Sequence, residues 1–85
     1  MDLASAIKAK VEGLAAEVYA TAPKTVVGYP VPPPEVRWGN MFGRVTVELS
    51  FHWALEVELR RAVAAAGLEP RWQNYSCAVW RFPRH

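Results

Sequence analysis

Two side chains with metal-binding chemistry lie close together in the sequence, and they are His52 and Glu56. His52 and Glu56 are four residues apart, so a helix would place both on one face. A metal site needs at least a third ligand, and the remaining candidates are Cys77 and His85. The favoured interpretation of His52 is therefore a histidine that caps a helix or contacts a nearby carboxylate.

Nucleophilic catalysis also has little support in this sequence. Cys77 would need His52 within hydrogen-bonding distance, and no glycine-rich segment surrounds it. A buried structural thiol is the favoured interpretation of Cys77, and Ser50 is interpreted as a helix N-cap. The glycine spacing fits neither a dinucleotide fingerprint nor a phosphate-binding loop. We expect a protein that is not an enzyme and that binds no cofactor and no metal.

The unusual feature is aromatic, because the 85 residues include four Trp, three Tyr and three Phe, several of them beside arginine. Tryptophan and arginine are enriched in the energetic centres of protein interfaces. A sheet with exposed rings could instead stack on single-stranded bases while arginines hold the phosphates, or the rings could simply fill the core. The sequence predicts a protein-binding site made by Arg37, Trp38, Arg71, Trp72, Trp80 and Arg81.

Charge and cysteine content narrow the class of protein. Ten basic and eight acidic residues give a net charge of +2, which is too small for a protein that binds nucleic acid mainly through its net field. The single cysteine cannot form an internal disulfide, which favours the reducing cytoplasm. No apolar run approaches the roughly 20 residues that cross a bilayer, and no signal peptide is recognisable. We expect a cytoplasmic protein without a membrane partner.

The first third of the chain predicts one helix and one connection. Residues 3–20 repeat apolar side chains at spacings of three and four, which predicts an amphipathic helix that ends near Thr21, before Pro23. Residues 25–29 form a short β-prone run. The proline-rich residues 30–34 are predicted to be a stiff surface spacer.

The middle of the chain predicts antiparallel strands. Residues 35–38 and 41–42 fit two strands joined by a hairpin turn at Gly39-Asn40, with Gly43 as a bulge. The strict alternation of apolar and polar residues over 44–51 predicts the most regular strand. Such alternation is typical of a sheet with one covered and one exposed face.

A second helix follows. Residues 52–66 change to a helical period, and Gly67 is predicted to end the helix in a left-handed conformation. In that geometry Leu68 folds back onto Val63, and Pro70 prevents extension.

The last segment leaves two alternatives. Residues 71–82 are β-prone, and a turn at Gln73-Asn74 would divide them into a hairpin, so both one strand and a hairpin remain open. The overall order, helix, strand, strand, helix, strand, predicts an α+β two-layer sandwich with two helices on one face of a three- to four-stranded, mainly antiparallel sheet. An extra hairpin strand fits at either β region. Residues 1–85 are expected to form one compact domain.

These expectations combine into one functional hypothesis. The chain is predicted to be a small protein-binding module that acts stoichiometrically as a regulator, inhibitor or adaptor, with another protein or a second copy of itself as partner. The analogy is to small regulators of phage or mobile-element origin and rests on size. The alternative is binding to single-stranded RNA or DNA through the same residues. A second alternative is a small metal or thiol enzyme that uses His52, Glu56 and Cys77.

Overall fold

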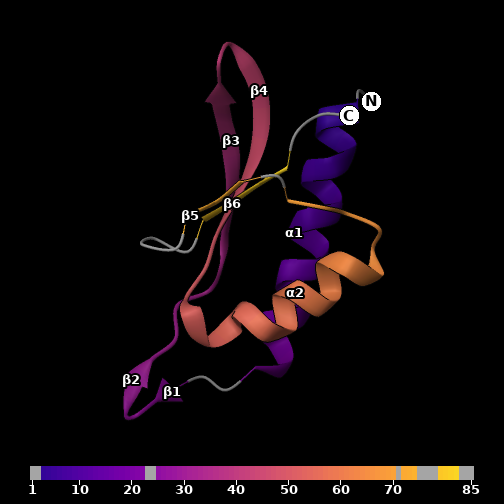
Figure 1. Cartoon of the computed structure of the whole chain (residues 1–85). Helices are drawn as coiled ribbons and strands as arrows, with labels where there is room; N and C mark the ends of the chain where they lie inside the picture. The colour runs from indigo at the N-terminus through magenta and orange to yellow at the C-terminus, as the bar shows by residue number, and fades with distance from the viewer. Residues whose placement is uncertain (1–2, 23–24, 71, 75–78, 83–85) are drawn as a thin grey trace.

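The structure, a computed structural model, describes residues 3–22, 25–70, 72–74 and 79–82 (Figure 1). It confirms the predicted α+β class. The elements in chain order are α1 (Leu3–Thr21), β1 (Thr25–Val26), β2 (Tyr29–Pro30), β3 (Glu35–Met41), β4 (Arg44–Ser50), the short 3₁₀ helix η1 (Trp53–Leu55), α2 (Glu56–Ala65), β5 (Trp72–Asn74) and β6 (Val79–Phe82).

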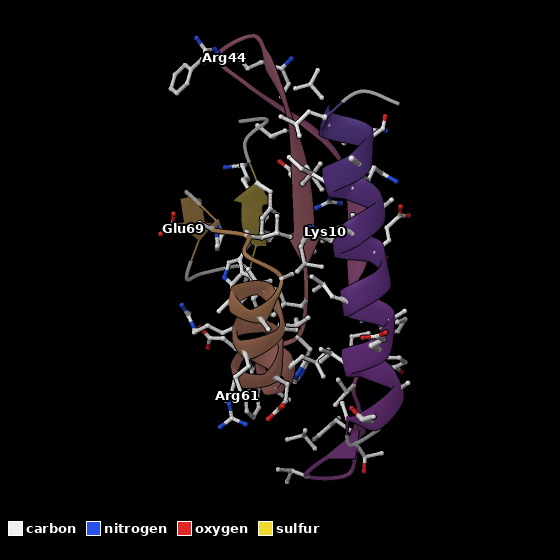
Figure 2. All side chains as sticks on the ribbon, turned by 90° about the vertical axis from the view of Figure 1, so that its right-hand side faces the viewer. Lys10, Arg44, Arg61 and Glu69 are labelled. Carbon is white, nitrogen blue, oxygen red and sulfur yellow. The ribbon has the colours of Figure 1, made fainter. Side chains whose placement is uncertain are left out.

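The main sheet has four antiparallel strands in the order β3-β4-β6-β5. Strands β1 and β2 form a separate small hairpin before the main sheet. Strands β5 and β6 pair at the end of the chain, so each predicted β region contains an additional strand. The two helices contact each other, with α2 crossing α1 (Figure 1), while α1 also contacts β3 and β4 and runs alongside them (Figure 2). Because α1 and α2 share one core with the sheet, the opposite face carries no helix among the residues that the structure describes.

The core lies between the helices and one face of the sheet. In β4, Val47 and Leu49 point toward the helices, and their partners in β6 are Phe82 and Trp80. Alternation places Glu48 on the other face. The core cluster is Val11, Leu14, Ala15, Val18, Val31, Val47, Leu49, Phe51, Leu55, Leu59, Val63, Trp80 and Phe82.

The predicted turn at Gly39-Asn40 is wrong, because β3 continues to Met41 and the hairpin turns at Phe42-Gly43. Phe42 and Gly43 have φ angles of 52° and 78°, which is the left-handed pair that a two-residue hairpin turn requires. The Asn40 side-chain oxygen accepts a hydrogen bond from the Gly43 N–H at 3.1 Å. Gly43 therefore belongs to the turn and not to a bulge.

The start of the second helical segment differs from the prediction in one residue. Ser50 is not the N-cap, because it is still paired in β4. His52 caps η1 instead, since its Nδ1 accepts a hydrogen bond from the Ala54 N–H at 3.1 Å. The capping interpretation of His52 is thus confirmed.

The end of α2 follows the predicted chemistry. Gly67 has φ 75°, and the N–H of Leu68 donates to the carbonyl of Val63 at 3.0 Å. The N–H of Gly67 donates to Ala64 at 3.0 Å, which completes the paired bonds of a glycine-terminated helix. Leu68 packs against the core.

The last strands resolve the open alternative in favour of a hairpin. Gln73 and Asn74 lie in β5, opposite Trp80 and Val79, so the predicted turn at these two residues is wrong. The connection between β5 and β6 lies outside the described residues. The short length of β5 explains the error, because the polar pair that suggested a turn is most of the strand itself.

The proline-rich segment is fastened to α1. Val31 is buried, and the Tyr19 hydroxyl donates to the Val31 carbonyl at 2.9 Å. Because proline restricts the backbone, this anchor sets where β3 starts relative to the helix.

Candidate functional site

The uncovered face of the sheet carries a row of charged residues. The register pairs Arg37 of β3 with Glu48 of β4, and Glu48 with Arg81 of β6. Arg81 Nε lies 2.9 Å from one carboxylate oxygen of Glu48, and Arg37 Nε lies 3.4 Å from the other. Arg37 also donates to the Ser50 hydroxyl at 3.1 Å. Two of the predicted site residues therefore meet at a shared carboxylate.

Glu48 is a residue that the sequence analysis missed. Its side chain is 14% exposed and lies over Gly39, where a Cβ atom would approach the carboxylate to 2.6 Å. A side chain at residue 39 would therefore require the Glu48 carboxylate to move, and Gly39 lies within β3 and not in a turn. The alternation of residues 44–51 already placed Glu48 on the polar face of the strand, but its partners depend on the register with β3 and β6.

Trp80 lies on the opposite, helix-covered face and belongs to the core. Its side chain is 3% exposed, and its ring meets Phe51 edge-on with 4.5 Å between ring centroids. The Arg60 guanidinium lies 5.3 Å from the Trp80 ring centroid. A ring enclosed in this way is not available on the surface, so we leave Trp80 out of the candidate site.

Trp38 shares that face but lies in the outermost strand and is 48% exposed. The Lys8 ammonium of α1 lies 5.6 Å from its ring centroid, within the range of a cation–π contact. Val45, diagonal to Trp38 across the β3–β4 pair, is 43% exposed. An apolar surface therefore borders the outer edge of β3.

The outer edge of β3 offers unpaired backbone groups. The turn bond closes the Met41–Arg44 pair, so by alternation Glu35, Arg37 and Gly39 also direct their backbone groups toward β4. The intervening residues Val36, Trp38 and Asn40 direct their N–H and C=O groups outward. Among the described residues no backbone group of another segment bonds to these three positions.

A groove runs beside the start of this edge. It has a volume of about 380 Å³ and is lined mainly by small or apolar side chains of α1 and of the segment that leads into β3. Its walls include Ala15, Ala16, Tyr19, Ala20, Pro34 and Val36. The groove and the outward backbone groups of β3 therefore form one continuous feature, which we call the β3 edge.

The remaining predicted residues are not part of the β3 edge. Trp72 pairs with Arg81 from β5, at the other side of the sheet, and Arg71 lies outside the described residues. The register therefore brings three of the six predicted residues, Arg37, Arg81 and Trp72, into one row across the open face, while Trp38 and Trp80 lie on the other face.

A second exposed tryptophan was also missed. Trp53 is 65% exposed at the start of the helical segment, and Val57, one turn later, is 60% exposed. A spacing of four on the face away from the core could have identified this pair from the sequence. The centroid of the Trp53 ring lies 5.1 Å from the centroid of the His52 ring.

Of the three residues of the metal or thiol alternative, His52 and Glu56 have other hydrogen-bond partners, and Cys77 lies outside the described residues. His52 Nδ1 caps η1, and Glu56 accepts a hydrogen bond from Arg60 at 2.9 Å. No group of three His, Cys, Asp or Glu side chains suited to a metal ion occurs in the part of the chain that is described, and Cys77 lies outside it.

Within the described ranges, neither helix has the length and apolar character that crossing a bilayer requires. Comparison with known proteins adds no relative: no family model, curated protein or solved structure matches this chain. The candidate site therefore stands on the geometry of the β3 edge alone.

Proposed function

We propose that this chain is a non-catalytic protein-binding module that holds an extended segment of a partner protein along the β3 edge. It would act stoichiometrically, as a regulator, inhibitor or adaptor. The observation that carries the proposal is the row of outward backbone groups at Val36, Trp38 and Asn40. Added strands bind sheet edges through main-chain hydrogen bonds, and side-chain pockets give the specificity.

The contrast between the two sheet edges supports this proposal. Proteins commonly protect edge strands by making them short or by placing proline, lysine or a bulge in them. Strand β5 has three residues, whereas β3 has seven, with no proline and no lysine and an unbroken register against β4. The two charged residues of β3, Glu35 and Arg37, both fall on the open face by alternation, so a long and regular edge without proline, lysine or a bulge is suited to pairing.

The side chains beside the edge suit a protein partner. Trp38 offers a half-exposed ring at the middle of the strand, and aromatic side chains anchor many protein interfaces. The groove next to Pro34 and Val36 offers space for side chains of an added strand.

The open sheet face supports nucleic acid less well. Binding of single strands by a sheet uses rings on the exposed face. The register places a single tryptophan, Trp72, on this face in the described strands, and the two arginines beside it, Arg37 and Arg81, both bond to Glu48. We therefore keep nucleic acid as an outcome of the test.

The test is a pull-down from host lysate with the tagged chain, with and without nuclease, compared with Trp38→Pro. Proline removes the outward N–H and the ring, yet an edge position whose N–H faces solvent tolerates it. We expect partner capture that survives nuclease and is lost in Trp38→Pro, while the circular dichroism stays that of the parent.

The matched control is Trp53→Ala, which removes another exposed ring away from the edge and is expected to keep the partner. Capture that is lost with nuclease would replace the proposal with nucleic-acid binding. Capture that persists in a folded Trp38→Pro would exclude the β3 edge.

A further inference from the structure

Resting on the proposed use of the β3 edge, we propose that its partner is a second copy of this chain, paired antiparallel about a two-fold axis at Trp38. The dimer joins two four-stranded sheets into one continuous sheet with β3 beside β3 of the partner. The arguments are the register of the backbone groups, the charges on the open face and the room on α1.

The backbone selects one register. In a two-fold antiparallel pair the axis passes through either a hydrogen-bonded or a non-hydrogen-bonded pair of symmetry mates. Centres of the second kind, at Arg37 or Gly39, oppose Asn40 to Pro34 or Val36 to Phe42 and so leave one outward position without a suitable partner. A centre at Trp38 pairs Val36 with Asn40 of the other copy in both directions and uses every outward group. A centre at Val36 opposes Trp38 to Pro34, which has no N–H.

A centre at Asn40 fails for a different reason. It opposes Trp38 to Phe42, which lies in the hairpin turn with a left-handed backbone. The register centred on Trp38 is thus the one that leaves none of the three outward positions without a partner. It also brings the two half-exposed Trp38 rings side by side.

The open face is charge-complementary in this register. Arg37 of one copy lies opposite Gly39 of the other, and the Glu48 carboxylate of that copy occupies the space above Gly39. Each Arg37 therefore approaches a second carboxylate across the axis. Two arginines already share Glu48 within one chain, so the additional contact extends an existing row of charges.

The helix layer leaves room for the second copy. A two-fold axis normal to the sheet places both α1 helices on the same side, and α1 covers both β3 and β4. Its flank above the groove carries Ala16 and Ala20, both exposed, and small side chains permit helices to approach closely. Lys8 and Glu12 on α1 form an ion pair at 3.3 Å, so the flank brings no net charge to the axis.

Sedimentation equilibrium of the purified chain tests this inference. We expect twice the chain mass of 9.5 kDa for the parent and for Trp53→Ala, and the chain mass for a folded Trp38→Pro. A parent that stays at the chain mass at every concentration overturns the homodimer. If such a monomer still captures a protein that Trp38→Pro loses, the proposed function stands without this inference. A dimer that persists in a folded Trp38→Pro places the self-contact elsewhere and overturns this inference, while the pull-down still decides the proposed function.

Oxidative cross-linking tests the register. In a Cys77→Ser background, Trp38→Cys places two thiols at the axis, where paired Cα atoms are about 5.5 Å apart and within disulfide range. We expect a covalent dimer for Trp38→Cys and none for the control Glu35→Cys, which this register moves away from its symmetry mate. Equal cross-linking of both variants, or of neither in a chain that dimerises, would contradict the Trp38-centred register.

Discussion

Two tryptophans on one face of the same sheet differ sharply in solvent exposure. Trp80 in β6 is 3% exposed, and Trp38 in β3 is 48% exposed. Both alternate correctly toward the helices, so the strand pattern is not what separates them. The difference teaches that the position of a strand within the sheet, central or outermost, decides whether an inward ring becomes core or remains available for contact.

The packing around each ring explains why one tryptophan is buried and the other is exposed. Trp80 is part of the core cluster, where its ring meets Phe51, and α2 adds the Arg60 guanidinium over the ring. Around Trp38, α1 adds Lys8, but no strand lies beyond β3. We call these the packed half and the open half of the covered face.

The largest expected effect is in the packed half. Trp80→Ala removes a buried ring and leaves a cavity, so the free energy of unfolding should fall by about 3–5 kcal/mol. The matched Trp38→Ala should lower it by only about 1 kcal/mol, through lost partial burial and the Lys8 contact. Urea denaturation followed by circular dichroism measures both. Equal losses would show that Trp38 is as much a part of the core as Trp80.

A smaller effect is expected at Gly39, which lies in β3 next to Trp38 but on the opposite face of the sheet. Gly39→Ala introduces a methyl group where the Glu48 carboxylate lies, so the Arg37 and Arg81 contacts must shift. The free energy of unfolding should fall by about 1–2 kcal/mol, because charge-assisted hydrogen bonds of a mostly buried carboxylate are weakened.

Gly13→Ala is the matched control for Gly39→Ala. A Cβ at Gly13 meets no atom within 4 Å, and Gly13 lies inside α1. Helix propensity then predicts a gain of about 0.5–1 kcal/mol in the same denaturation experiment. A loss at Gly13 together with no change at Gly39 would reverse this account of the two glycines.

The smallest effect is expected at the hairpin turn between β3 and β4. Phe42 is 92% exposed with φ 52°, a conformation that asparagine adopts more readily than phenylalanine. Phe42→Asn should raise the free energy of unfolding by about 0.5–1 kcal/mol, measured as a higher denaturation midpoint. Gly43→Ala, at φ 78°, should lower it. If Phe42→Asn lowers stability, the exposed ring has a stabilising contact that outweighs its backbone strain.

Much of the fold was predictable because its signals are local. Gly67 ends α2 with its left-handed φ, and α1 ends at Thr21, where the sequence predicted it to end before Pro23. The alternation of β4 follows from the two-residue period of a strand. The hairpin turn was misplaced for the same reason. Glycine is typical of turns, but Gly39 lies inside β3, where the carboxylate of Glu48, nine residues away, packs over it.

The candidate site was predictable only in part. Trp38 and Arg37 were identified, and both lie in β3, whereas Trp80 was placed in the same group because it too stands beside arginine. Adjacent residues of a strand point to opposite faces, so an arginine next to a tryptophan in sequence does not share its surface. Glu48 could join its two arginines only once three strands were in register.

By itself, the sequence determined the α+β class, the extents of the helices to within a few residues, and which face of β4 is apolar. These properties depend on periodicity and on single residues that restrict the backbone. The tertiary structure decided that β3 is outermost, that Trp38 is exposed while Trp80 is buried, and that Glu48 lies over Gly39. The physical reason is that strand order and register are set by contacts between distant segments, and no local pattern in the chain encodes which strand is left without a neighbour.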